Sequence, residues 1–163
     1  MRKRVILAAL LAAGLAGSAH AQAVREPSAG PYPHFGLQGS VGENVNLGVG
    51  VRYENRMTGM FPAMPNLRFA ASFDYFFPDS PARYWEINTN VFDLLTVHNA
   101  RVVPYVGGGL NIAHSNGGGG NSDVGLNVLG GLRLPGRYRP YLEARIELGG
   151  GDRFVATLGW LLW

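Results

Sequence analysis

Residues 67–77 read LRFAASFDYFF and alternate between two kinds of side chain. The odd-numbered positions are apolar or aromatic, whereas Arg68, Ser72 and Asp74 occupy even-numbered positions. Successive side chains of a β-strand point to opposite faces, so this period of two predicts a strand with one apolar and one polar face. A tilted strand needs about 9–11 residues to cross a bilayer, and this segment is long enough to do so.

Alternation continues along the rest of the chain and predicts eight strands. These segments, about 9 to 13 residues long, are 34–42, 45–54, 67–77, 84–95, 101–113, 122–134, 138–148 and 153–163. Pro33, Pro65, Pro104 and Pro140 each stand at or just before an odd-numbered segment, where a residue that cannot donate to the ladder is tolerated. The predicted fold class is all-β, an eight-stranded antiparallel up-and-down barrel.

The first residues have the layout of an export signal. Arg2, Lys3 and Arg4 precede an apolar run of 13 residues at 5–17, and Ala19-His20-Ala21 forms a small-x-small cleavage site. That run is shorter than the ~20 residues that a membrane-spanning helix needs. We therefore expect a cleaved signal peptide at 1–21, a leader at 22–33 and a barrel domain at 34–163.

The charge of the whole chain is misleading about its partners. The formal net charge is +3, but the three basic residues near the start would be removed with the signal peptide. The remaining chain carries 11 Arg and 11 acidic residues and is neutral, so we expect no binding to nucleic acid. The chain has no cysteine, which excludes disulfides and a lipoprotein anchor.

Alternation alone does not say which face is buried. Apolar faces meet inside a soluble sandwich, whereas they face lipid in a membrane barrel whose interior is polar. Aromatic residues near the ends of the predicted strands favour the membrane barrel, because such rings gather at the level of the lipid headgroups. The expected interface aromatics are Phe77 and Trp85 at one rim, and Tyr53, Phe69, Tyr138 and Trp163 at or near the other.

The chain resembles the small outer-membrane β-barrel proteins of Gram-negative-type bacteria, the OmpA/OmpX/opacity-like group. The similarity is carried by 104–110 (PYVGGGL), 125–132 (GLNVLGGL), 140–145 (PYLEAR) and an aromatic last residue. It implies a monomer in the cell outer membrane, with membrane lipid, periplasmic chaperones and the barrel-assembly machinery as partners. It also implies an assembly signal in the last strand, in which Leu161 and Trp163 would face lipid.

Two features depart from that pattern. The connections 43–44, 78–83, 114–121 and 149–152 are short, which disfavours the adhesive role of opacity-type proteins with long loops. The connection 55–66 is long for a periplasmic turn and contains Met57, Met60, Phe61 and Met64. It would fold as an interfacial segment, or else the strand order slips there. In the last strand, the sequence leaves open which of Trp160 and Trp163 faces outward.

The predicted polar face carries the residues that could act inside the barrel. They are Arg52, Glu54, Arg68, Asp74, Glu86, Arg133, Glu143, Arg145 and Glu147. Opposite charges in a narrow interior should pair, because an unpaired buried charge is very costly. An eight-stranded barrel is just wide enough to be filled by its own side chains. We therefore expect a plugged barrel with a structural or interaction role, in preference to a gate on a small conductance.

Two other functions fit parts of the sequence. Outer-membrane lipid A deacylases resemble this chain in fold and use a His-x-Ser pair followed by Asn, so His114, Ser115, Asn116 and the later Asp123 are the corresponding candidates. Adjacent strand residues point to opposite faces, so His114 and Ser115 should not act together, and we expect no enzyme. The other alternative is a soluble periplasmic barrel that binds an apolar ligand inside.

No metal site or cofactor is expected. His34, His98 and His114 are scattered, and the chain has no cysteine. The glycine run 117–120 lacks the Lys-Ser/Thr ending of a phosphate-binding loop.

A membrane barrel further requires that Val49, Phe73, Ile87 and Leu126 point outward.

Overall fold

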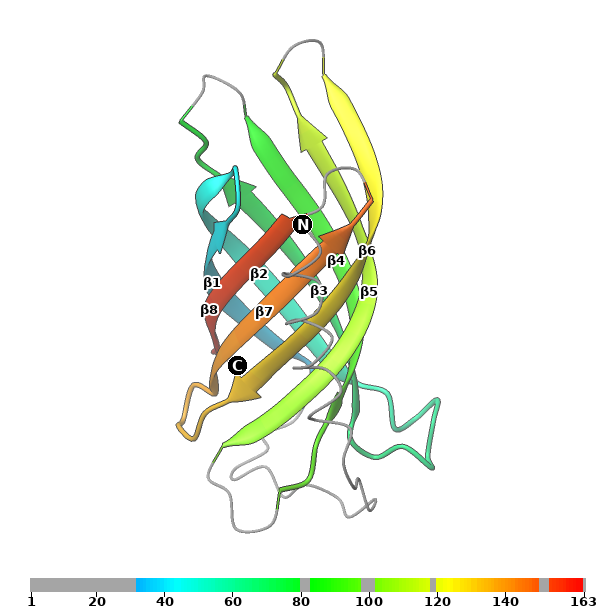
Figure 1. The fold of residues 1–163 in the computed structure, drawn as a ribbon. Coiled ribbons are helices and arrows are strands. Elements are labelled where there is room, and N and C mark those ends of the chain that lie inside the picture. Colours follow the sequence, from blue (N-terminus) through cyan, green and yellow to red (C-terminus); the bar gives the residue numbers. More distant parts are fainter. Residues whose placement is uncertain (1–31, 80–82, 98–101, 118–119, 150–152, 163) are drawn as a thin grey trace.

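A computed structural model describes residues 32–79, 83–97, 102–117, 120–149 and 153–162. They form eight strands in a closed barrel, each strand paired with its neighbours in the sequence (Figure 1). The strands are β1 (His34–Gly42), β2 (Asn46–Arg56), β3 (Leu67–Phe76), β4 (Tyr84–Leu94), β5 (Val103–Ser115), β6 (Asn121–Arg133), β7 (Pro140–Leu148) and β8 (Arg153–Leu161). The predicted fold class is confirmed. The predicted signal peptide, most of the leader and Trp163 lie outside the described residues.

All eight pairings are antiparallel, and β1 closes the barrel against β8 through pairs from Gly36↔Leu161 to Gly42↔Val155. Every predicted strand is present, with ends that differ by a few residues. The ladder between β2 and β3 continues beyond the predicted end, to Arg56↔Arg68. The strand order does not slip at the long connection, so that alternative is wrong.

Antiparallel pairing gives the barrel two distinct ends. The end where β1 begins and β8 finishes also carries the β2–β3, β4–β5 and β6–β7 connections, and we call it the terminal end. The opposite, distal end carries the other four connections. The β1–β2 turn there is tight because Asn44 and Asn46 both adopt positive φ, which asparagine tolerates better than most residues.

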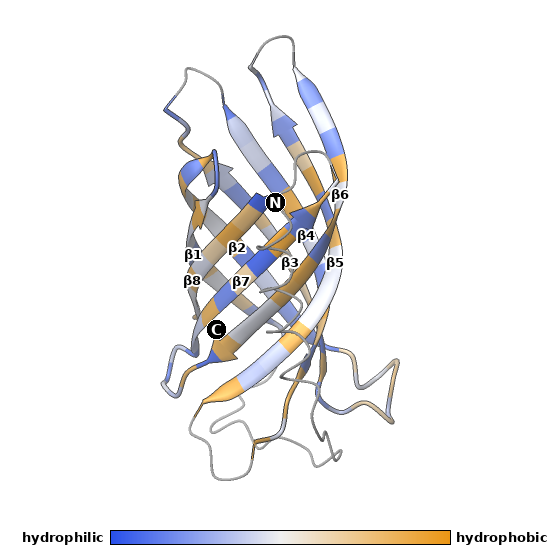
Figure 2. Cartoon of the chain, viewed as in Figure 1, coloured by the Kyte–Doolittle hydropathy of each residue, from blue (hydrophilic) through white to orange (hydrophobic). Residues whose placement is uncertain are grey.

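The outward face is apolar, as the sequence predicts for a membrane barrel. Val49, Phe73, Ile87 and Leu126 all point outward, with exposed fractions of 53%, 42%, 41% and 56%. Hydrophobic and hydrophilic residues follow one another along the strands (Figure 2). A continuous apolar belt of this kind exceeds what a monomeric soluble protein usually exposes.

The inward face is polar and charged. Buried residues of the described barrel include Arg52, Glu54, Asp74, Glu86 and Arg145, each at most 3% exposed. This composition disagrees with the alternative of a soluble barrel with an apolar ligand inside, because an apolar ligand beside these groups would have to displace their polar partners.

A charged substitution on the outward face tests whether the apolar belt faces lipid or water. Val51 lies near the middle of this belt, paired with Leu37 and Phe73. We expect Val51→Arg to lower the free energy of unfolding in lipid vesicles by about 2–4 kcal/mol, because the midplane disfavours charge. Denaturant unfolding in vesicles measures this, with Val51→Ala as the matched control. Equal stability of the two variants would contradict a lipid-facing belt.

Candidate functional site

The interior is the candidate site, and its first component is an ion-pair network toward the terminal end. Arg133 donates from Nη2 to both carboxylate oxygens of Glu54, at 2.8 Å each. Arg52 donates from Nη1 to Glu143 Oε2 at 2.9 Å, and its Nε lies 3.7 Å from Glu54 Oε2. The network thus contains two cations and two anions and is electrically neutral, as a buried cluster must nearly be.

Aromatic side chains hold this network in place. The Arg52 guanidinium lies 4.7 Å from the centre of the Tyr141 ring and 5.4 Å from that of Phe92. Such contacts with aromatic ring faces favour a cation. The Tyr105 hydroxyl donates to Glu143 Oε2 at 3.0 Å. Phe92 and Tyr105 also join Ala70, Leu94 and Leu129 in an apolar cluster that fills the adjoining interior.

A second network lies toward the distal end. Arg145 donates to Glu86 Oε2 at 3.0 Å and to Glu147 Oε1 at 2.9 Å. Arg153 lies 3.3 Å from Glu86 Oε1 and 3.4 Å from Glu147 Oε2, so this network is also neutral. The Tyr84 hydroxyl donates to Glu86 Oε1 at 2.7 Å, and the Tyr84 ring lies 4.4 Å from the Arg153 guanidinium.

An apolar cluster adjoins the second network. Phe76, Tyr84 and Val155 pack there with Ala113 and Val45, a turn residue that is only 6% exposed. Phe76, Tyr84 and Val155 come from three different strands, so inward rings and methyl groups from across the barrel meet at this level. These contacts fill the distal part of the interior with side chains.

Uncharged polar side chains adjoin the second network, where Asn88 donates to Glu86 Oε2 at 3.5 Å. Asp74 accepts hydrogen bonds from Gln38 Nε2 at 2.6 Å and from Ser72 Oγ at 3.1 Å. Asn127 donates to Asn88 and Asn90 at 2.9 and 3.0 Å. The carboxylate of Asp74 is therefore held by neutral donors.

The nine predicted interior charges are all buried, but only seven of them join the two networks. Asp74 belongs to the polar side chains beside the second network, opposite Glu86 on the neighbouring strand. Arg68 lies at the terminal end, where it donates to the Tyr32 hydroxyl at 3.1 Å and to the carbonyl oxygen of Pro65 at 2.9 Å. Arg153 was missed, although it is the only charged residue of β8 and that charge could have marked the inward parity of the strand.

Glycines give the large interior side chains their space. Tyr105 pairs across the strands with Gly131, and Tyr141 pairs with Gly159. A Cβ at Gly159 would lie 2.4 Å from the Tyr141 ring, so the ring occupies the volume that a side chain would need. Phe76 lies against Gly48 in the same way. The sequence shows the glycines, but only the register shows which ring each one accommodates.

The predicted interface aromatics lie in two groups on the outer face. Tyr53 and Phe69 contact each other near the terminal end, with ring centres 6.5 Å apart. Toward the distal end, Trp85 stacks 6.1 Å from Phe73, and Phe77 lies 5.3 Å from Tyr75. Tyr138, in the β6–β7 turn, is 50% exposed.

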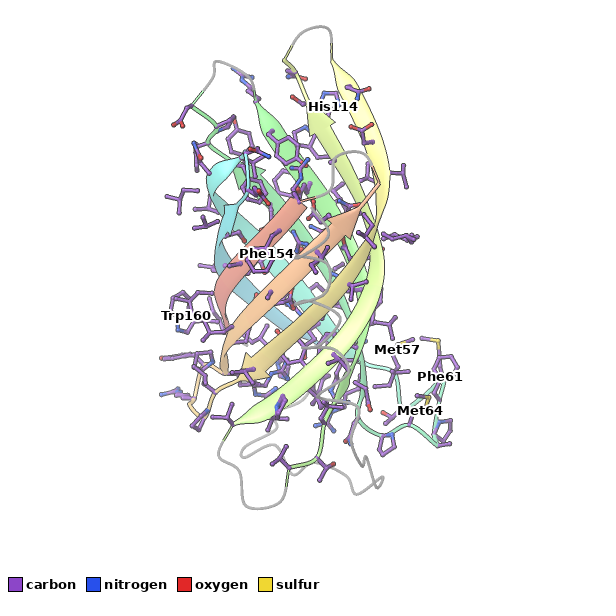
Figure 3. The ribbon with its side chains drawn as sticks, in the orientation of Figure 1. Met57, Phe61, Met64, His114, Phe154 and Trp160 are labelled. Carbon is purple, nitrogen blue, oxygen red and sulfur yellow. The ribbon has the colours of Figure 1, made fainter. Side chains whose placement is uncertain are left out.

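The expectation that Leu161 faces lipid is wrong. Leu161 is 2% exposed and points inward, because it shares the parity of the inward residues Val155 and Thr157. Trp160 and Phe154 both point outward and are 41% and 48% exposed (Figure 3). This settles the direction of Trp160, while the orientation of Trp163 and the assembly signal are not described.

Near the distal end, the structure brings together a His, a Ser and an Asn that the sequence did not combine. His114 Nδ1 lies 2.8 Å from Ser122 Oγ on the adjacent strand, and His114 Nε2 lies 2.5 Å from Asn116 Oδ1. Of the predicted candidates, His114 and Asn116 belong to this group, whereas Ser115 Oγ accepts a hydrogen bond from Gly117 N and Asp123 accepts from Asn121. Trp85 packs 5.2 Å from the imidazole.

Within the described ranges, no helix is long and apolar enough to cross a membrane. Among the same residues, no group of three or more His, Asp or Glu side chains is arranged to hold a metal ion.

Comparison with known proteins identifies the fold and no sequence family. No family model and no curated protein matches the chain. Among solved structures, the N-terminal β-barrel domain of Pseudomonas aeruginosa OprF matches with a TM-score of 0.59 and 13% identity, over 78% of this chain and 94% of that one. Neisserial surface protein A matches with a TM-score of 0.56 and 14% identity, over 80% and 94%. The chain has the fold of the small, OmpA-like outer-membrane barrels.

Removal of one arginine from the second network should show how much an unbalanced buried charge lowers the stability of the barrel. We expect Arg145→Met to destabilise the barrel by about 3–5 kcal/mol, because Arg153 alone would then have to balance both Glu86 and Glu147. Denaturant unfolding in vesicles measures this, and Arg137→Met, at an exposed turn position, is the control. An equal, small effect of both substitutions would show that the interior charges are hydrated separately.

The pairing of glycine with a ring gives a second test. We expect Gly159→Ala to destabilise the barrel by about 1–3 kcal/mol, because the new methyl group meets the Tyr141 ring. Tyr141→Leu should remove most of this additional penalty in a double-mutant cycle. Gly39→Ala is the control, because its Cβ would meet nothing nearer than 4.0 Å. Additive effects in the cycle would contradict the proposed contact.

Proposed function

We propose that the mature chain is a monomeric barrel that spans the cell outer membrane and has a structural or interaction role without catalysis. Its interior would be plugged by the two ion-pair networks. The observation that carries this proposal is the opposition of faces: the outward side chains form an apolar belt, and the charged side chains are buried inside. In a membrane barrel, lipid covers the first set and the narrow interior encloses the second.

The interior contacts favour a plug over a pore. The two networks link strands on different sides of the barrel, since Arg52 of β2 reaches Glu143 of β7, and Arg145 of β7 reaches Glu86 of β4. An ion entering this interior would have to displace paired charges and the rings beside them. A large conductance would require that many of these contacts be absent.

Recording from single molecules in planar lipid bilayers tests the plug. We expect no large, stable conductance from the wild-type protein. A variant in which Glu86, Arg145, Glu147 and Arg153 are all replaced by Ser should conduct measurably, because the distal network would be removed without leaving one of its charges unpaired. Heat-modifiable gel migration should first show that both proteins are folded. A large, stable wild-type conductance would contradict the plug.

Hydrolysis of a lipid ester is a second candidate function, favoured by one observation. Ser122, His114 and Asn116 form a continuous hydrogen-bonded chain at the distal rim, and these residue types can provide a nucleophile, a base and an orienting group. All three are accessible from outside the barrel, where a lipid could approach.

The two functions make different predictions for lipid A. With a non-catalytic barrel, lipid A from cells that produce the wild-type protein should have the same acylation as lipid A from cells that produce Ser122→Ala. Mass spectrometry of extracted lipid A measures this, with cells lacking the protein as the reference. Loss of an acyl chain with the wild type, but not with Ser122→Ala, would replace the first proposal by the second.

A further inference from the structure

The connection between β2 and β3 exposes apolar side chains at the terminal end. We call residues 57–66 the methionine loop. Met60, Phe61 and Met64 are 73%, 46% and 47% exposed, and the loop contains no charged residue. For a segment outside the strands, this is a large apolar surface to leave in water.

The loop is a folded series of turns. Phe61 N donates to the carbonyl oxygen of Met57 at 2.8 Å, Met64 N to that of Phe61 at 3.0 Å, and Leu67 N to that of Met64 at 3.1 Å. These bonds satisfy part of the backbone within the loop itself. The apolar side chains are thus presented on a backbone that needs fewer partners from its surroundings.

The loop continues the outward face of the barrel. Met57 N donates to the carbonyl oxygen of Leu67 at 3.1 Å and so extends the β2–β3 ladder by one rung. Met57 shares the outward parity of Tyr53, and Leu67 shares that of Phe69. Figure 3 shows Met57, Phe61 and Met64 projecting sideways from the barrel wall, away from its axis. Whatever covers the outer face near Tyr53 and Phe69 therefore also meets the loop.

The charges around the loop fit an anionic surface. No acidic residue lies between Glu54 and Asp74, whereas Arg56 is exposed at the barrel end immediately before the loop, with its guanidinium 4.5 Å from the centre of the Tyr32 ring. Lipid headgroups carry phosphate, which attracts an arginine at that depth. Methionine side chains are flexible and polarizable, which suits contact with disordered acyl chains.

We propose that the methionine loop inserts into the lipid leaflet at the terminal end and anchors that rim of the barrel. Met60, Phe61 and Met64 lie among the upper acyl chains, and Arg56 lies at the level of the phosphates. This inference rests on the proposed membrane-spanning function, but it adds a lipid contact outside the strands. The occupant is lipid because the loop is continuous with the outward belt.

Site-directed spin labelling tests the proposal directly, because the chain contains no cysteine of its own. Single variants Met60→Cys, Leu37→Cys and Asn44→Cys are labelled with a nitroxide and folded into vesicles of phosphatidylethanolamine and phosphatidylglycerol. Leu37 reports the outward belt, and Asn44 reports the distal turn. Oxygen, which enters lipid, and a water-soluble nickel chelate are compared as relaxing agents.

We expect the label at position 60 to resemble the label at 37, with at least a threefold higher oxygen-to-nickel accessibility ratio than the label at 44. A ratio at 60 equal to that at 44, while 37 stays protected, would overturn the loop proposal and leave the membrane barrel intact. Equal access of nickel to 37 and 44 would instead overturn the proposed function itself.

Two further arms identify the occupant. Protection at 60 should persist as the protein is diluted tenfold in lipid, and protection that disappears on dilution would show that a second copy of the chain covers the loop. Arg56→Gln should reduce the protection at 60 more in vesicles that contain phosphatidylglycerol than in vesicles of neutral lipid. An equal effect in both would overturn the assignment of Arg56 to the phosphates.

Discussion

The width of an eight-stranded barrel is the constraint on which the rest of this structure depends. Such a barrel encloses only enough space for its own side chains, so several of the large residues inside need a glycine opposite them. Cross-strand pairs such as Tyr105 with Gly131 and Tyr141 with Gly159 meet this requirement. The high glycine content of the chain, 24 residues, is thereby explained in part by packing inside the barrel.

The same narrow space makes the charges interdependent. Charges that are 3% exposed or less, such as Arg52 and Glu86, are stable there only when each has partners of opposite sign, and the two networks provide them at 2.8–3.7 Å. Because the partners lie on different strands, the networks also cross-link the barrel wall. The proposed structural support and the proposed closure of the interior would thus result from one set of contacts.

The sequence predicted the fold well and the contacts within it poorly. Period-two alternation around Phe73 and Asp74 is a local property, so it revealed the strands and the two faces. The pairing of Arg52 with Glu143, 91 positions away, depends on register and on barrel closure, which no local pattern contains. The predicted direction of Leu161 was wrong for a related reason. Both faces of β8 are largely apolar, so hydropathy did not determine which residues of this strand point inward.

The central claim is that an apolar exterior faces lipid while a paired, charged interior closes the barrel. Fractionation of cells that produce the full chain, with sequencing of the mature N-terminus and gel migration before and after heating, tests it most directly. The protein should begin at Gln22, remain with the outer membrane until detergent is added, and migrate differently after boiling. Recovery from the periplasm as a soluble protein without detergent would contradict the account.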